Sequence, residues 1–519
     1  MLFWLFMVLI VFCGAFICVN FNLIGCVSTL TMLGSLWEMF GVVDNITISI
    51  LLMLVICFGY AYLYTGHYFC GDVMGVKLNQ LICLFVSVMF SLVLTGDFLT
   101  TLVFWEYLGV VSFFLILFYS NYLSLRSSVV TLVASRFGDV SMFLLIALSC
   151  YVNYLCIVPA VIIYFIVFTK SAGFPFISWL LEAMRAPTPV SSLVHSSTLV
   201  AAGVWFSMRY NVFSYLSDSM LYLITLLLTI FITGLCCFFF LDLKKIVALS
   251  TCNNISWCLV YLICGDVVLS LFQLVSHGVS KCLLFMLVGD VMSGTGGSQA
   301  SNCVYTPRLY GNWGLFGLFS IVLGLSGAPF IGVFFTKHLF LTYFFSGVNL
   351  SVVCFIYLCV FLSYFYSFRL CSILNNLNNS CSSGVLFSFG SGIMVYFWLI
   401  INCYLSNILD EVNLVGYLPS TILLIFQLVS CLTAYYLYNS NLISNWSSSL
   451  FGCDSIVEMF YNWYCSASNM VSLFFFRWDN NLMTLFRGYG SSIMYLFNFN
   501  ILNIIMLFFI FLMCFNIVY

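Results

Sequence analysis

Ionisable side chains lie inside apolar stretches of this sequence, where a membrane interior is expected. Glu106 stands near the middle of FLTTLVFWEYLGVVSFFLILF, and His277 and Lys281 stand in VVLSLFQLVSHGVSKCLLFMLVG. The histidine and the lysine are four residues apart, so they share one face of a helix. A charge at mid-bilayer costs roughly 2.5–3.5 kcal/mol, and ionisable residues at that depth are functional by default. These residue types therefore predict groups that take up and release protons.

Further candidates lie where apolar runs are interrupted. Lys170 ends the run VPAVIIYFIVFT just before a Gly-Phe-Pro break, and Lys337 follows a second break, GAPF. His195 falls early in the span after two prolines, and Asp139 lies about a turn inside its span. Glu106 and Lys170 have opposite charges, and a lysine that responds to a nearby carboxylate is a switchable proton carrier. We treat the seven residues as one candidate site.

Each of these assignments has a structural alternative. Glu106 would otherwise form an ion pair without transport, and His277 a hydrogen bond between helices. The lysines at the two breaks would be interfacial anchors if their spans ended a turn away. Lys244 and Lys245, in FFFLDLKKIVAL, stand at a span boundary. We expect these two to orient the chain in the membrane rather than to carry protons.

The elements that position these groups are membrane-spanning helices. Of the 519 residues, 64% are hydrophobic and only 6% are charged, whereas soluble domains carry about 25% charged residues. The apolar runs are continuous and lack alternation, which excludes a transmembrane β-barrel. At roughly 20 residues a span, the chain has room for about 14 to 16 helices. Among the expected spans are 1–20, 98–119, 245–264, 384–403 and 500–518. The predicted fold class is an all-α polytopic membrane protein.

Some segments of the chain depart from a simple series of membrane spans. The paired interruptions, at Lys170 and before Lys337, favour two inverted repeats with broken helices, as in secondary transporters. Residues 21–43 are mixed and suit either a short hairpin or a poor second helix. Residues 440–498 carry apolar residues at helical spacing, which favours a lateral amphipathic helix over another span. The expected segments are 1–75, N-terminal helices; 76–210, a first half-channel; 211–375, a second half-channel; 376–439, additional helices; 440–498, the lateral helix; and 499–519, a C-terminal anchor.

Composition also excludes several kinds of site. The 24 cysteines lie mostly in apolar runs without a CxxC pair, so we interpret them as small hydrophobes and expect no metal or Fe–S site. The glycine run GTGG lacks a following helix signature and is not interpreted as a nucleotide site. Fourteen basic against sixteen acidic residues leave no basic face for nucleic acid.

A family resemblance rests on specific stretches. KSAGFPFISWLLEAMRAPTPVSSLVHSSTLVAAGV resembles the signature of the chain 5 family of mitochondrial NADH–ubiquinone oxidoreductase, respiratory complex I. That family shares its antiporter-like fold with the large subunit of multisubunit cation/proton antiporters. FWEYLGVVSFFLI, SRFGDV, DLKKIVALST, HGVSKCLLFMLVG and SGAPFIGVFFTKHLF stand in the family's order. The resemblance covers about residues 97–345.

The resemblance implies a role for each candidate. Glu106 would be the central glutamate, Lys170 its partner on a broken helix, Lys281 the central lysine of the second half-channel and Lys337 the terminal lysine. The two histidines would link these groups, and Asp139 matches an acidic position near the subunit boundary. Two features depart from the family. Arg185-Ala186 precedes PTPVS where Glu-Gly is usual, and His338 follows the terminal lysine where an acid is usual.

The function implied is that of a proton-translocating core membrane subunit of complex I, coupling NADH:ubiquinone electron transfer to proton pumping across the mitochondrial inner membrane. The chain would be an enzyme only as part of that complex. It would bind no cofactor itself, because NADH, FMN, Fe–S clusters and ubiquinone would be bound by other subunits. Its partners would be membrane lipids and neighbouring antiporter-like subunits. The alternatives are the large subunit of a multisubunit cation/proton antiporter and a structural scaffold.

Overall fold

The computed structural model confirms a helical membrane protein. It describes residues 25–32, 37–149, 157–215, 219–305, 311–327, 333–344, 350–377, 417–438, 453–486 and 504–508. The chain divides into two compact units, Met1–Ser448 and Ser449–Tyr519. In the described part, ten helices are long and apolar enough to cross a membrane. The expected spans at 1–20 and 384–403, and most of that at 500–518, lie outside the described residues.

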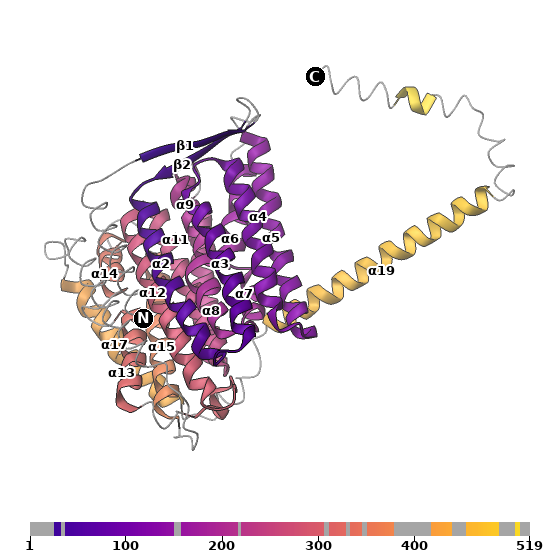
Figure 1. The fold of residues 1–519 in the computed structure, drawn as a ribbon. Coiled ribbons are helices and arrows are strands. Elements are labelled where there is room, and N and C mark those ends of the chain that lie inside the picture. Colours follow the sequence, from indigo (N-terminus) through magenta and orange to yellow (C-terminus); the bar gives the residue numbers. More distant parts are fainter. Residues whose placement is uncertain are drawn as a thin grey trace. The chain divides into compact units, whose positions relative to one another are not determined.

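The first unit contains a strand pair followed by a series of helices (Figure 1). Several short helical turns join or end the longer helices. The elements are β1 (Gly25–Met32), β2 (Trp37–Val43), α2 (Asn45–Tyr68), α3 (Val73–Leu94), α4 (Phe98–Ile116), η1 (Leu117–Tyr119), α5 (Tyr122–Ser149), α6 (Ile157–Lys170), α7 (Ile177–Ala183), α8 (Thr188–Leu193), η2 (Val194–Thr198), α9 (Leu199–Arg209), η3 (Val212–Tyr215), α10 (Ser219–Phe239), α11 (Leu243–Ile263), α12 (Val267–Ser293), η4 (Ser301–Cys303), α13 (Gly311–Ser326), α14 (Val333–Phe344), α15 (Leu350–Asn375) and α17 (Tyr417–Tyr438).

The strands β1 and β2 form an antiparallel pair at one end of the helix bundle (Figure 1). This finding decides between the two interpretations of residues 21–43 in favour of the hairpin. Arg209, the last residue of α9, holds the hairpin to the bundle. Its guanidinium donates to both carboxylate oxygens of Asp44, at 2.8 and 2.6 Å, and to the carbonyl oxygens of Val42 and Thr95, at 2.9 and 3.3 Å. Nη1 makes both contacts to the carboxylate, and Nη2 and Nε make those to the two carbonyls, so one guanidinium joins three chain segments.

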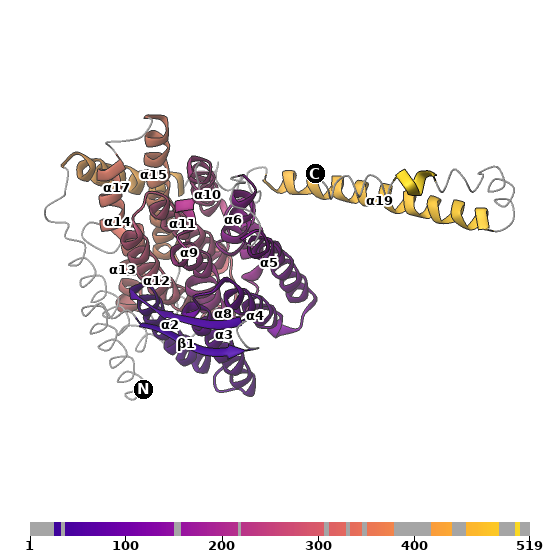
Figure 2. The ribbon, with the colours of Figure 1, turned by 90° about the horizontal axis from the view of Figure 1, so that it is seen from above.

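The most polar spans are also the most buried. Nearly all residues of α11, of α12 and of the span Thr188–Arg209 are buried, whereas only about a third of the residues of α3 and α5 are buried. Viewed along the bundle, α9, α11 and α12 lie between α4 and α5 on one side and α15 and α17 on the other (Figure 2). Helices with charged side chains are placed inside the bundle because charges facing lipid are costly.

Both expected breaks interrupt a helix. Between α6 and α7, the carbonyl oxygen of Ala172 accepts from the Cys252 thiol, at 3.0 Å, and Ala172 has a positive φ of 55°. Between α13 and α14, the carbonyl oxygen of Gly327, at φ 93°, accepts from the Gln427 amide at 2.7 Å. Side chains of neighbouring helices thus satisfy backbone groups that the breaks release, as non-helical backbone at membrane depth requires.

The second unit contains one long helix, α19 (Cys453–Phe486). Its 34 residues make it about 51 Å long at 1.5 Å a residue. It lies within the range 440–498 that the sequence assigns to an amphipathic helix, and it is not among the ten helices apolar enough to span a membrane. Its position beside neighbouring subunits stays a prediction.

Candidate functional site

The seven candidate residues all lie in the first unit, on helices that pack together. Glu106 alone is substantially accessible, with 36% of its side chain exposed. The other six residues are each 2% exposed or less. They are Asp139 on α5, Lys170 at the end of α6, His195 on η2, His277 and Lys281 on α12, and Lys337 on α14. This burial excludes interfacial anchoring as the role of the lysines at the two breaks.

The carboxylates of Glu106 and Asp139 are joined by an arginine that the sequence prediction missed. Arg136 lies 3.7 Å from Glu106 and 3.4 Å from Asp139, so its guanidinium bridges α4 and α5. Glu106 and Lys170, expected as partners, form no direct ion pair. The reason is that Arg136, one turn before Asp139, occupies the place beside Glu106. The charges of Asp139, Arg136 and Glu106 nevertheless all act on the Lys170 ammonium.

Lys170 and His195 are brought together at a small cavity. Its volume is about 10 Å³, and both residues lie on its wall with Trp179, Ser135 and several other side chains. A space of this size holds about one water molecule. The Lys170 ammonium makes no hydrogen bond to the described part of the chain and lies 5.2 Å from the ring centroid of Trp105. The cavity therefore provides a direct connection between the lysine of the break and the histidine of the next span.

His195 lies on a π-helical turn, η2, between α8 and α9. Hydroxyl groups satisfy the carbonyls that this wider turn displaces. Ser197 and Thr198 donate to the carbonyl of Leu193, at 3.1 and 3.0 Å, and Ser196 donates to that of Ser192. Turns of this type inside α-helices are frequent at functional sites.

Two of the candidate residues, His277 and Lys281, lie on α12. The Lys281 ammonium donates to the hydroxyl of Ser250 on α11, and His277 lies one turn before it. Neither ring nitrogen of His277 has a hydrogen-bond partner in the described ranges. Both residues are buried, so the charge of Lys281 acts on His277 without screening by bulk water.

Lys337 bridges the second break. Its ammonium donates to the carbonyl of Ser326, the last residue of α13, at 2.6 Å, and to the hydroxyl of Ser363 on α15, at 2.7 Å. It also lies 4.4 Å from the ring centroid of Tyr364. The freed carbonyl at the end of a half-helix is a natural partner for a cation.

Gln273 connects the α12 residues to Lys337. It lies four residues before His277, so it shares the face that also carries Lys281. Its side-chain oxygen accepts from the Thr336 hydroxyl at 2.8 Å, and Thr336 directly precedes Lys337 on α14. The sequence prediction missed this residue because it considered only ionisable groups.

Three other basic residues are now accounted for. Arg185 pairs with Glu182 at 3.0 Å, and both side chains are about one-third exposed, so this departure from the family pattern is a surface ion pair. Lys245 pairs with Asp242 at 2.8 Å, which suits a boundary residue. Lys244, however, is 4% exposed and donates to a backbone carbonyl at 3.4 Å, so its side chain faces the interior.

Known proteins resemble this chain in sequence. A family model described as NADH:quinone oxidoreductase/Mrp antiporter, TM, matches residues 95–365. NADH-ubiquinone oxidoreductase chain 5 of Caenorhabditis elegans is 35% identical over 329 residues, which are 60% of this chain and 62% of the relative. The chain 5 protein of Artemia franciscana is 30% identical over 419 residues, which are 75% of each chain. The chain thus spans about 60% of the length of the first of these relatives.

Solved structures share the fold at lower sequence identity. The Mrp complex from Dietzia sp. DQ12-45-1b contains a chain with a TM-score of 0.69 and 20% identity, covering 88% of this chain and 55% of that one. The membrane-bound sulfane sulfur reductase, an archaeal respiratory membrane complex, gives a TM-score of 0.65 at 17% identity, covering 83% of this chain and 92% of that one. Together with the family match over the span that carries all seven candidates, these likenesses show that the chain belongs to the NADH:quinone oxidoreductase/Mrp antiporter transmembrane family.

Proposed function

We propose that this chain is a proton-translocating core membrane subunit of respiratory NADH:ubiquinone oxidoreductase. One observation carries the proposal. Buried ionisable groups are gathered in the helices of the first unit: Arg136 bridges Glu106 and Asp139, and Lys170 and His195 line one cavity. Lys281 and Lys337 each donate to polar groups of neighbouring helices. Relatives named NADH-ubiquinone oxidoreductase chain 5 support the assignment to this complex.

Transport would proceed by changes of protonation among these groups. Charging Lys170, Lys281 and Lys337 together would cost roughly 8–10 kcal/mol at mid-bilayer, comparable with the whole stability of a typical domain. In the proposed mechanism, a charge on one lysine would disfavour a charge on the next, because like charges repel. Groups coupled in this way titrate as one system. A proton added to one lysine would thus favour release of a proton from another. A change of charge at Lys170 would in this way alter the protonation of Lys281 and Lys337.

The wider assignments belong to the same proposal. The chain would hold no redox group, and NADH, FMN, Fe–S clusters and ubiquinone would be bound by other subunits. The helix α19 would lie beside neighbouring antiporter-like subunits, where a long amphipathic helix can cover several partners. The membrane would be the mitochondrial inner membrane, in keeping with the chain 5 relatives.

A second candidate is the large subunit of a multisubunit cation/proton antiporter. The TM-score of 0.69 to a chain of the Mrp complex favours it, because the same buried charges would serve both proteins. The two candidates differ in their partners. Purification of the native assembly decides between them: flavin and Fe–S subunits in the same complex support the first candidate, and their absence supports the second.

The transport role is tested by Glu106→Gln and Lys281→Ala in the assembled complex. We expect fewer protons pumped per NADH oxidised in both variants, because each removes a charge from these groups. Glu182→Gln is the control, since Glu182 belongs to a surface pair whose side chains are about one-third exposed. Undiminished pumping per NADH, with intact assembly, would contradict the transport role and favour a structural scaffold.

A further inference from the structure

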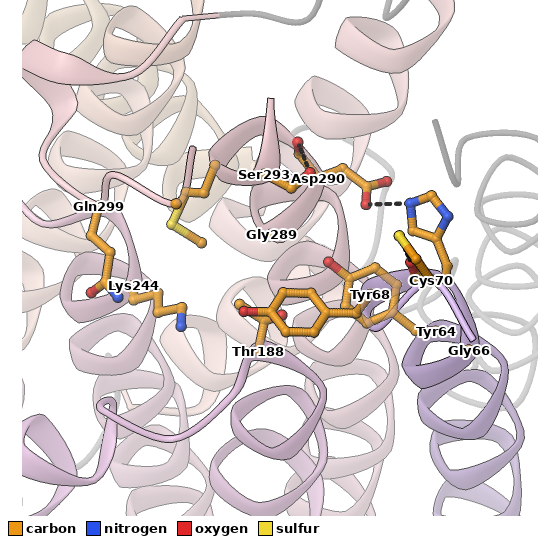
Figure 3. A pocket seen from close by; sticks show the side chains of 13 residues that line it. Tyr64, Gly66, Tyr68, Cys70, Thr188, Lys244, Gly289, Asp290, Ser293 and Gln299 are labelled. Carbon is orange, nitrogen blue, oxygen red and sulfur yellow. Dashed lines mark hydrogen bonds and ion pairs between the residues drawn. The ribbon is translucent and has the colours of Figure 1, made fainter. Parts of the chain in front are cut away.

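A large cavity lies at the end of the first unit opposite the hairpin. Its volume is about 680 Å³, and it is formed where α2 and α12 end and where α8 and α11 begin (Figure 3). We call it the basal chamber. The residues that line it are mostly glycines and residues with a polar group: Tyr64, Gly66, His67, Tyr68, Cys70, Thr188, Lys244, Gly289, Asp290, Met292, Ser293, Gly297 and Gln299.

The wall of the basal chamber is suited to water. At about 30 Å³ for each molecule of liquid water, the volume corresponds to roughly 20 molecules. Lys244 and Gln299 lie on one side of the chamber and Asp290 on the other (Figure 3). The buried hydroxyl of Thr188 has no hydrogen-bond partner among the residues that the structure describes. An ammonium, a carboxylate, an amide and a hydroxyl around one space give water the several polar partners that it needs.

An ion pair joins the ends of α2 and α12 at this chamber. Nε2 of His67 lies 3.6 Å from Oδ1 of Asp290. The two side chains differ in access, because His67 is 20% exposed whereas Asp290 is 2% exposed. Histidine is the side chain that ordinarily changes charge near neutral pH. The pair therefore places a group able to exchange protons with the aqueous phase next to a carboxylate that faces the chamber.

Two helices lead from the chamber to Lys281. Asp290 and Lys281 are nine residues apart on α12, about 13.5 Å at 1.5 Å a residue. Lys244 and Ser250 are six residues apart on α11, about 9 Å, and Ser250 accepts the hydrogen bond from Lys281. At the chamber wall on α12, a Cβ at Gly289 would collide with the hydroxyl of Tyr64. A glycine at this position therefore lets that hydroxyl lie against α12.

We propose that His67 and Asp290 are a proton-collecting pair that supplies Lys281 through the basal chamber; this inference rests on the proposed function. The protonated imidazole gives its proton to the Asp290 carboxylate and takes another from the aqueous phase. Asp290 then passes its proton to water in the chamber, and the proton crosses the remaining distance, about 9 Å along α11 from Lys244 to Ser250, to Lys281. Each group returns to its starting state, so no co-reactant is needed. The other titratable groups on the wall are Lys244 from α11 and Tyr64, Tyr68 and Cys70 from α2 and the turn after it.

Chemical rescue separates proton transfer from a structural role. In the assembled complex in vesicles, we expect His67→Ala to lower the rate of NADH-driven proton pumping about a hundredfold at neutral pH, the lower end of the range for loss of a positioned acid–base group. Imidazole added to the uptake side should restore the rate, because the chamber is large enough to admit it. Pyrazole, a ring of the same size that is barely basic, should not.

Further variants make the test decisive. Asp290→Asn should slow pumping as His67→Ala does, but imidazole should not restore it, because the inner acceptor is missing. If His67→Ala fails to assemble, His67→Gln keeps a hydrogen-bonding side chain and is subjected to the same rescue. The control is again Glu182→Gln, since the surface pair of Glu182 and Arg185 does not line the chamber.

Two results would overturn the proposal: pumping by both His67 variants at the rate of the unmodified complex, or equal rescue by pyrazole and imidazole. Failure of the wider function appears differently. If Lys281→Ala pumps normally, the proposed function is wrong. If Lys281→Ala abolishes pumping while the His67 variants do not affect it, only the proton-collecting pair is refuted.

Discussion

The hydroxyl of Ser363 provides a quantitative test of how Lys337 is held. It accepts from the Lys337 ammonium at 2.7 Å and donates to the carbonyl of Val360 at 2.6 Å. A hydrogen bond to a charged group contributes about 1.5–3 kcal/mol. Ser363→Ala removes one of the two polar contacts of the ammonium and leaves the carbonyl of Ser326. The proton-loaded form of Lys337 should lose that amount, a factor of about 10 to 150 in its loading equilibrium.

Ser367 is a matched control on the same helix. Its buried hydroxyl donates to the carbonyl of Tyr364 at 2.6 Å, the same i−3 contact that Ser363 makes with Val360, and it makes no hydrogen bond to Lys337. The two alanine variants therefore lose the same backbone contact. The difference between Ser363→Ala and Ser367→Ala isolates the bond to the lysine.

The assay is the number of protons pumped per NADH oxidised, measured against pH. In Ser363→Ala, loading requires a higher proton activity, so the pH at which pumping falls to half should move about one to two units towards acid. Ser367→Ala should follow the unmodified complex. Equal pH profiles for the two variants would show that the Ser363 contact does not control the charge of Lys337.

Three further predictions follow from individual contacts. Gln273→Leu and Thr336→Val should each slow pumping, and the double variant should be no slower than the worse single one, because both remove the same bridge; additive losses would contradict this. Arg209→Ala should destabilise the first unit by about 3 kcal/mol in thermal unfolding, and Arg209→Lys should restore little, because one ammonium cannot reach the Asp44 carboxylate and the carbonyls of Val42 and Thr95 together. Gly203→Ala should lower assembly, measured on native gels, because its Cβ would lie 3.0 Å from the carbonyl of Val167 beside the first break; normal assembly would show that the break can adjust.

Much of the fold follows from the lengths of apolar runs. The spans expected at 98–119 and 245–264 match α4 with η1 and α11 within two residues, since uninterrupted apolar runs of about 20 residues leave little choice in a membrane. The hairpin at residues 25–43 was only one of two options in the sequence. Contacts from Arg209, more than 160 residues away in the chain, hold that segment in place, and local composition does not reveal them.

In the site, too, spacing along one helix could be predicted from the sequence, whereas contacts between helices could not. The i, i+4 spacing of His277 and Lys281 predicts a shared helix face, and the structure places them so. The expected contact between Glu106 and Lys170 depends on how α4, α5 and α6 pack, and there Arg136 takes the place beside the glutamate. Arg136 itself had a local signal, because it stands three residues before Asp139 in SRFGDV. Lys244 resembled a boundary lysine until the packing of four helix ends around a chamber showed where its ammonium lies.

The central claim is that buried charge on α12 carries protons, and the proton-to-NADH ratio of Lys281→Met tests it most directly. Methionine keeps the approximate volume of the side chain in its buried site and removes the charge and the bond to Ser250. We predict a complex that assembles and oxidises NADH while pumping fewer protons for each NADH. An unchanged ratio in a fully assembled complex would contradict the account.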